Sequence, residues 1–525
     1  MTELPQGAVN DTRDSVPPQT RSSLPPPSAQ RKLVKHASHY SIASLLSVIA
    51  GLVTFPLLTR VFSVHDYGVL SLLSATLGIA VAIGKTGLQH AIVRYFSEIS
   101  AKKSEFTLPQ LYSTAIIGML VSALVTMAVM ALGAHFVPST WIEDTRFRAL
   151  LVIVAVLGVI QVLDSVMSNF LVADQNSSAQ LKYQFAKKYL GLGAIVVAVL
   201  LIAPTLTAFW WAKVVAEGIA LGLPIYFLFA ARSDLRPRLQ NFSRPLYAKL
   251  LAYGIPMVIG YELSGIVLNV GDRYIIDAMM GETDLGLYSA AYSLSQYVQS
   301  IFISSIGQAI MPIYMRMWDE KGPEETVKFI SDSLRSYVLV SAPVIAGLAS
   351  VGPELLPSLA SEKYASAAGV LPWLSSGMIV DGAASFLGAG LFVHRKSRVV
   401  AVIVFASAVA NIAFNLVLVP RLGVLGAAIA TLGSYALLCV GFAWRGKPLL
   451  DVKVPWATIV RASLVGVVMY AALHYVLPGR RFITVGVRAA LGGAIYVGLI
   501  TLLDRDARKL VKMFAGKLRQ RLGRA

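Results

Sequence analysis

The sequence predicts an all-α polytopic membrane protein, and three observations carry that prediction: few charged residues, long apolar runs, and lysine and arginine gathered between the runs. Only 14% of the 525 residues are charged, against roughly 25% in soluble domains. A helix that crosses ~30 Å of hydrocarbon needs about 20 apolar residues. Fourteen runs suit that length. Each is expected to be helical, because backbone groups that face lipid must bond within their own segment.

The fourteen runs are separated by charged or Pro- and Gly-rich stretches. In chain order their approximate limits are 38–59, 68–92, 110–134, 147–172, 187–203, 205–230, 248–270, 284–311, 333–352, 366–393, 397–419, 423–444, 456–477 and 482–503. Such limits are uncertain by about two to four residues. The chain is therefore expected to cross the membrane about fourteen times.

The two ends of the chain differ from this pattern. Residues 1–36 hold six prolines among Ser, Gln and Asp, which predicts a disordered cytoplasmic tail rather than a signal peptide. Residues 504–525 combine eight lysines and arginines with an apolar stripe of Ala507, Leu510, Val511, Phe514 and Leu518. This basic amphipathic pattern favours a helix that lies on an anionic cytoplasmic leaflet. A solvated basic tail is the alternative.

The net charge of +18 is expected to report membrane orientation. With a cytoplasmic N-terminus, the inner loops hold 22 lysines and arginines, Lys187 among them, and the outer loops hold nine, including Arg488. This bias predicts that both termini are cytoplasmic. Binding of nucleic acid is excluded, because the chain is too apolar to present its basic residues on a polar face.

Several kinds of site are absent from the sequence. A single cysteine, Cys439, excludes an intramolecular disulfide and cysteine-based zinc or iron–sulfur sites. We find no catalytic constellation and no GxxxxGK[ST] phosphate loop, so this chain is not expected to hydrolyse ATP. The sequence therefore predicts neither an enzyme, nor a cofactor, nor a metal site.

An internal repeat appears when the sequence is shifted by 218 residues. Residues 66–71 (DYGVLS) then align with residues 284–289 (DLGLYS), and residues 91–92 align with 309–310. Both copies occupy a predicted outer loop and the helix that follows it. We therefore expect an N-lobe of six helices over 37–245, a C-lobe of six over 246–445, and two additional helices over 446–503. Transporters built from such halves place the substrate between them.

Several short segments carry a family resemblance. They are Leu58 to Gly68 (LTRVFSVHDYG), Gly87-Leu88 with Ala91 to Phe96 (AIVRYF), Tyr253 to Pro256 (YGIP), Asp272 to Ile276 (DRYII), Gly286 to Ser289 (GLYS), and Asn411, Asn415 and Pro420 to Thr431 (PRLGVLGAAIAT). In order and spacing they resemble the oligosaccharide flippases of the polysaccharide-biosynthesis branch of the multidrug/oligosaccharidyl-lipid/polysaccharide exporter superfamily.

The resemblance implies two six-helix lobes around a central cavity in a bacterial cytoplasmic (inner) membrane. It implies movement of an undecaprenyl-diphosphate-linked oligosaccharide to the outer leaflet. The implied partners are this lipid-linked oligosaccharide, membrane lipids, and polysaccharide polymerase and assembly proteins. A cation-coupled exporter of small molecules is the alternative. A glycan polymerase or ligase is a more distant one, because it needs a larger outer region than the dozen or so residues around 135–146.

Four basic residues are candidates for contact with the substrate. Charges inside spans cost about 2.5–3.5 kcal/mol on insertion scales and usually face a cavity or a partner. Lys85 and Lys213 lie within predicted spans, Arg94 ends one of them, and Arg273 lies at the outer end of another. The alternatives are a lysine that snorkels, an arginine that marks the cytoplasmic side, and a gate or helix-end contact made by Arg273 with Asp272.

Four intramembrane acids are candidates for coupling transport to a proton or another cation: Glu217, Glu262, Asp381 and Asp164. Glu262 follows a proline, Pro256, that permits a bend in its helix. Glu217 lies four residues after Lys213, so the two could simply neutralise each other. A structural hydrogen bond is the alternative for Glu262 and Asp381.

Overall fold

The computed structural model describes residues 48–136, 144–230, 232–300, 305–476, 482–504, 506–509 and 511. The proline-rich stretch 1–36 and most of the basic stretch 504–525 lie outside these residues. The described residues form helices and their connections, with no strand among them. The predicted all-α fold class is confirmed.

Within the described residues, eleven helices are long and apolar enough to cross a membrane. In chain order they are α2 (Val64–Gly84) with α3 (Leu88–Ser100), α4 (Leu108–Gly133), α5 (Phe147–Ala173), α6 (Ser177–Val197) with η1 (Ala198–Ile202), α7 (Leu206–Phe229), α11 (Pro323–Leu359), η6 (Glu362–Val370) with α12 (Leu371–Leu387), α14 (Ser397–Leu422), α15 (Val424–Gly446), α16 (Trp456–Val476) and α17 (Phe482–Leu503).

The other three apolar runs are also helical where they are described. The first is represented by a helix over Val48–Val61. The second corresponds to α8 (Arg244–Met257), η4 (Val258–Glu262) and the first part of α9 (Leu263–Gln299), and the third to the rest of α9 with α10 (Ser305–Lys321). Several charged residues lower the hydropathy of α9. Gly281 interrupts it with a φ of 82°, which glycine adopts without strain.

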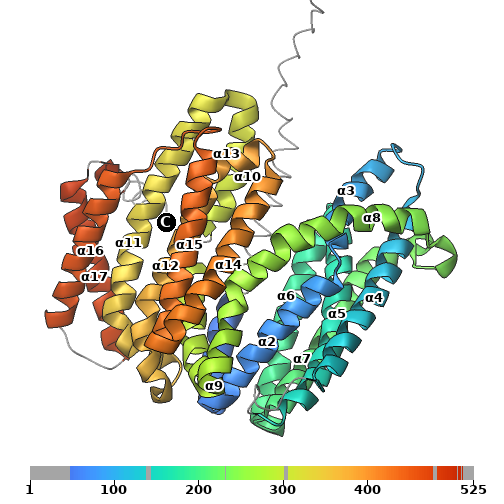
Figure 1. The fold of residues 1–525 in the computed structure, drawn as a ribbon, viewed down its shortest axis with the longest axis horizontal. Helices are drawn as coiled ribbons and strands as arrows, with labels where there is room; N and C mark the ends of the chain where they lie inside the picture. The colour runs from blue at the N-terminus through green and yellow to red at the C-terminus, as the bar shows by residue number, and fades with distance from the viewer. Residues whose placement is uncertain are drawn as a thin grey trace, which may run out of the picture.

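The helices form two halves that meet at one end of the bundle (Figure 1). One half contains α2 to α7, and the other contains the part of α9 (Leu263–Gln299) after Gly281 and α10 to α15, with the short helix α13 (Ala389–Val393). Helices α16 and α17 pack on the outside against α11. We call the end where α2 begins the Asp66 end, and the opposite end the Arg94 end. The halves approach each other at the Asp66 end and diverge toward the Arg94 end (Figure 1).

The contact between α2 and α9 joins the two halves at the Asp66 end. A Cβ on Gly68 would overlap the carbonyl oxygen of Glu282, and a Cβ on Gly286 would overlap the carbonyl oxygen of Val64. One helical turn farther along, Ser289 donates a hydrogen bond of 2.7 Å to Ser71. Gly68 and Gly286, and likewise Ser71 and Ser289, are related by the 218-residue shift. The two repeat copies therefore pack against each other with reciprocal contacts.

The helix pair α8–α9 links the halves in a second way. Its α8 portion packs on α3 and α4, and the first part of α9 packs on α14 of the other half. Between them lie Pro256, which cannot donate a helical hydrogen bond, and the π-helical turn η4. Between the start of α8 and the first part of α9, this bent segment therefore passes from one half to the other.

Candidate functional site

The structure places the predicted site residues in three separate regions. Lys85, Arg94 and Glu262 lie where the α2–α3 bend meets η4; Asp164, Lys213 and Glu217 lie inside the first half; Arg273 and Asp381 lie in α9 and α12.

Glu262 is held by residues from both sides of the α2–α3 bend. Its carboxylate lies 3.8 Å from the Nζ of Lys85 and 3.4 Å from the Nε2 of His90, and it accepts a hydrogen bond from Gln89. The side chains of Lys85 and Glu262 are each about one-fifth exposed. The contact joins an acid on the bent α8–α9 segment to the first half of the molecule.

The backbone next to this contact explains why the two segments come so close. Thr86 and Gly87 both have positive φ, at 49° and 75°, and they turn the chain from α2 into α3. A Cβ on Gly87 would overlap the backbone of Gly254 in α8. Only glycine allows the backbones at positions 87 and 254 to come this close. The close contact brings Gln89 and His90 within reach of Glu262.

Arg94 lies on the exposed side of α3 near the same contact. Its guanidinium lies 4.9 Å from the centre of the Tyr253 ring on α8, and its Nε lies 3.2 Å from Glu98. Arg94 therefore pairs with Glu98 in its own helix and also contacts Tyr253 in α8.

The second region is a cluster of paired charges shared by α5, α6 and α7. Lys187 lies 2.6 Å from Asp164 and 3.6 Å from Glu217. Lys213 lies 3.9 Å from Glu217 and 5.3 Å from the centre of the Trp210 ring. Both acids are thus compensated by lysines. The local Lys213–Glu217 pair exists, but Lys187 is the closer partner of Glu217.

The third region contains Arg273 and Asp381 among tyrosines. Arg273 lies over the ring of Tyr292, 5.1 Å from its centre. The neighbouring Asp272 is 1% exposed and accepts a hydrogen bond from Tyr288. Asp381 precedes Gly382, and a Cβ on Gly382 would overlap the hydroxyl of Tyr337. No ion pair of Asp381 is found within the described residues.

A charged network that the sequence did not single out closes the Asp66 end. Arg146 lies 2.5 Å from Asp66 and 2.6 Å from Asp144, and the backbone N–H of Asp144 donates to Glu282 of the other half at 3.1 Å. His65 lies 4.0 Å from both Asp144 and Glu282. His65, Asp66 and Asp144 present possible metal ligands within 4.8 Å of one another, and the guanidinium of Arg146 supplies positive charge to the two carboxylates.

Two more contacts between the halves lie at this end. Arg60 donates to the carbonyl oxygen of Ser358 at 2.9 Å, and the ring of Tyr67 lies 5.9 Å from that of Tyr364. A signal that could have revealed the region was already in the sequence. The repeat copies at residues 66–71 and 284–289 mark the α2–α9 contact, although nothing in the pattern pointed to Arg146.

Asp144 is ionised in this closed network. Burial by itself would raise its pKa, but the hydrogen bonds and the charge of Arg146 outweigh burial and hold the pKa of Asp144 below its usual 3.8. The negative form is therefore the one that stabilises the closed Asp66 end.

Comparison with known proteins identifies the family of this chain. Residues 33–318, more than half of the chain, match the family described as polysaccharide biosynthesis protein. The chain belongs to this family. One relative, an uncharacterised membrane protein of Methanocaldococcus jannaschii, is 27% identical over 214 residues, which are 40% of this chain and 41% of the relative.

A second relative is named as a probable low-salt glycan biosynthesis flippase, Agl15, of Haloferax volcanii. It is 22% identical over 223 residues, which are 40% of this chain and 47% of the relative. The chain thus matches somewhat less than half of the length of either relative.

Solved structures show the same fold over most of the chain. The lipid II flippase MurJ has a TM-score of 0.73 at 13% identity, with 89% of this chain and 99% of that chain covered. A multidrug resistance transporter of the MATE family, in the MOP superfamily, has a TM-score of 0.63 at 14% identity, with 83% and 96% covered. This family member therefore has the same fold as MurJ and the MATE transporter, in agreement with the sequence resemblance.

Proposed function

We propose that this protein is a flippase that moves undecaprenyl-diphosphate-linked oligosaccharide repeat units from the inner to the outer leaflet of a bacterial cytoplasmic membrane. The Arg94 end and both termini are cytoplasmic in this proposal, in agreement with the lysine and arginine bias. The cargo then feeds surface polysaccharide synthesis. A polymerase and assembly proteins are the protein partners, and the chain itself performs no chemical reaction.

The observation that carries the proposal is the asymmetry between the two ends of the bundle. The halves are in contact through α2 and α9 at the Asp66 end, whereas they diverge at the Arg94 end. Lys85, His90 and Arg94 lie at or near the diverging end, and Glu262 is the acid that contacts Lys85 and His90. This arrangement suits uptake of an anionic head group from the cytoplasmic side. The match to a polysaccharide biosynthesis family supports a glycan as the rest of the cargo.

The contact between Lys85 and Glu262 suggests how loading changes the conformation. A diphosphate that binds Lys85 competes with Glu262, which releases the acid and frees the bent α8–α9 segment from the α2–α3 bend. Outward movement of the anion is favoured by an inside-negative potential, by about 2.3 kcal/mol per charge for each 100 mV. Return of the empty carrier therefore needs a coupling group. We assign that role first to Glu262, because the cargo would compete for its partner Lys85, and then to Asp381; Asp164 and Glu217 share Lys187 inside the first half.

The direct test is reconstitution of the purified protein into liposomes with a fluorescent lipid-diphosphate oligosaccharide. We expect labelled lipid to become accessible to a glycosidase on the opposite side, and a strain that lacks the protein to accumulate lipid-linked repeat units on its cytoplasmic leaflet. Failure of both assays would refute the proposal. Transport of a cationic dye without movement of the lipid would instead establish the small-molecule exporter, which the MATE-like fold also accommodates.

The role of the lysines is tested by Lys85→Ala and Lys213→Ala. Loss of a charge-assisted hydrogen bond to phosphate is worth about 1.5–3 kcal/mol, which corresponds to a decrease in glycan export of about tenfold or more. Lys→Arg should retain export if charge is the requirement. The control is Lys396→Ala, an exposed lysine between α13 and α14. Full export by the Lys85, Lys213 double variant at a normal protein level would exclude a phosphate role for both.

A further inference from the structure

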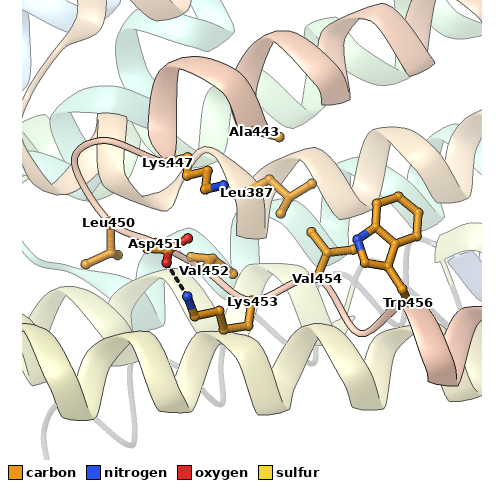
Figure 2. Close-up of a pocket in the computed structure, with 9 residues that line it drawn as sticks. All are labelled: Leu387, Ala443, Lys447, Leu450, Asp451, Val452, Lys453, Val454 and Trp456. Atoms are coloured by element: carbon orange, nitrogen blue, oxygen red, sulfur yellow. Dashed lines mark hydrogen bonds and ion pairs between the residues drawn. The ribbon is translucent and has the colours of Figure 1, made fainter.

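A pocket of about 300 Å³ lies at the Arg94 end, away from the interface between the two halves. It is formed where α12 and α15 end and where the chain leads into α16. The residues that line it are Leu387, Ala443, Lys447, Leu450, Asp451, Val452, Lys453, Val454 and Trp456 (Figure 2). Its volume is at the lower end of the range of about 300–1,000 Å³ typical of small-molecule sites.

The walls of this pocket are fixed by the surrounding fold. Leu450 and Val452 are only 4% and 9% exposed, and the backbone N–H of Lys453 donates to the hydroxyl of Ser331 on α11 at 3.0 Å. A Cβ on Gly390 of α13 would come within 3.0 Å of Leu450. The connection between α15 and α16 is therefore packed on two helices, and the pocket is formed in advance of any ligand.

The charges in the pocket favour a ligand with one negative charge. Lys453 pairs with Asp451, as Figure 2 shows, whereas Lys447 reaches into the pocket beside Leu387. No ion pair of Lys447 is found among the described residues. Two ammonium groups and one carboxylate leave one positive charge uncompensated. A lipid diphosphate carries more negative charge than this site can balance.

The surroundings indicate that the ligand comes from the bilayer. Trp456 and Trp444 are 70% and 73% exposed, and exposed tryptophans of this kind mark the interface between membrane and water. Val440 lies one turn before Ala443, and Val460 lies one turn after Trp456, and both are exposed. Apolar helix faces that would meet lipid chains therefore continue directly from the walls of the pocket.

We propose that this pocket binds the phosphodiester head group of a singly anionic bilayer phospholipid of the phosphatidylglycerol class. Lys447 donates hydrogen bonds to the phosphate, and the acyl chains extend along the exposed faces of α15 and α16. Such a site anchors the second half of the molecule, together with α16 and α17, to the leaflet at the Arg94 end. It does not depend on the identity of the transported cargo.

The test is native mass spectrometry of the full-length protein with equal amounts of phosphatidylglycerol and phosphatidylcholine of the same chain length. The parent is expected to retain phosphatidylglycerol in preference. Lys447→Gln should reduce that preference by about tenfold or more, as expected for a lost charge-assisted hydrogen bond. Lys396→Gln, which removes an exposed lysine at the same end but outside the pocket, should leave it unchanged.

A second variant separates the shape of the pocket from its charge. Ala443→Trp fills the pocket while both lysines remain, and it should also reduce retention of phosphatidylglycerol. Equal retention by the parent and both pocket variants would overturn the proposal. So would an equal loss in Lys396→Gln, which would indicate general attraction to the surface. Displacement of the lipid by millimolar inorganic phosphate would assign the pocket to free phosphate instead.

Discussion

At the scale of single residues, the intramembrane charges of this protein are explained by partners that lie far away in the sequence. Glu262 would be costly in lipid, but Lys85, Gln89 and His90 surround it. Lys187, which the pattern of lysines and arginines assigns to an inner loop, lies in α6 and pairs with Asp164. Arg488, counted as an outer-loop charge, lies in α17, is 3% exposed and pairs with Glu354.

The first prediction concerns Glu262→Gln. The amide keeps the size of the side chain but loses its attraction to Lys85, so the conformation with a closed Asp66 end should become less populated. A partly exposed ion pair is worth about 1 kcal/mol or less, which corresponds to about a two- to fivefold change. The measurement is the rate of thiol labelling of Ser293→Cys, a position in contact with Tyr67 at the Asp66 end, in a Cys439→Ala background.

The matched control for this prediction is Glu98→Gln. It removes the exposed partner of Arg94 on the same helix, α3, without touching η4. The labelling rate should then equal that of the parent. Identical rates for Glu262→Gln and the parent would show that the Lys85–Glu262 contact does not control the Asp66 end. The same comparison with Asp381→Asn tests the other acid proposed for coupling.

The second prediction concerns the pH dependence of the Asp66 end. Because the pKa of Asp144 is lowered in the closed network, its stabilising effect is complete above the usual value of 3.8 and is lost as the pH falls through the lowered pKa. Asp144→Asn should mimic the protonated state at neutral pH and raise labelling of Ser293→Cys about tenfold, because the hydrogen bonds from the charged guanidinium of Arg146 are weakened. Asp174→Asn, which disrupts a pair with Arg232 elsewhere, serves as the control. An unchanged labelling rate in Asp144→Asn would show that this network does not stabilise the closed Asp66 end.

At the scale of helices, two contacts between glycines determine how close the segments approach. Gly68 and Gly286 allow α2 and α9 to cross with their backbones in contact, and Gly87 and Gly254 allow the same for the α2–α3 bend and α8. Helices in lipid associate through close packing of this kind, because the hydrophobic effect contributes little to the free energy of their association. Side chains at these positions would separate the helices.

The third prediction is that Gly68→Ala opens the Asp66 end. The new methyl group would overlap a backbone carbonyl that cannot rotate away, so labelling of Ser293→Cys should increase about tenfold or more. Gly78→Ala provides a control on the same helix, because a Cβ there meets no atom within 4 Å. That change should be neutral or stabilise α2 by about 0.5–1 kcal/mol. Equal labelling in the two variants would contradict the packing argument.

At the scale of the whole molecule, the arrangement predicts movement of the two halves about the α8–α9 segment. Its α8 part packs on α3 and α4, and the first part of α9 packs on α14, with a π-helical turn after Pro256 between them. A bend of this kind can absorb a change of angle while each end keeps its packing. The outer helices α16 and α17, held on α11, would move with the second half.

The fourth prediction is the orientation of the whole chain. Reporter fusions after Arg244, at the start of α8, and after Lys321, at the end of α10, should report the cytoplasm. A fusion after Ser139, which lies outside the described residues, should report the external side. The bias of lysine and arginine toward one set of loops is the physical reason. An external signal at either basic position would reverse the assignment of the two ends.

The sequence by itself determined the class of the protein, because hydropathy depends on local composition. Long apolar runs must be helical in a bilayer, and every one of them is helical where the structure describes it. The 218-residue repeat was also visible in the sequence, and two of its equivalent positions, Gly68 and Gly286, meet in the structure. The family could be recognised from short motifs, because their order and spacing can be read directly from the sequence.

Only the tertiary structure decided which charges meet. Glu262 and Lys85 are 177 positions apart, and Arg146 reaches Asp66 across 80, so no helical or loop spacing could predict either pair. The physical reason is that an ion pair requires two side chains within about 4 Å, and that distance is set by the packing of several helices. The pocket around Lys447 likewise exists because α11, α12, α13 and α15 converge there, although its nine lining residues are dispersed between Leu387 and Trp456.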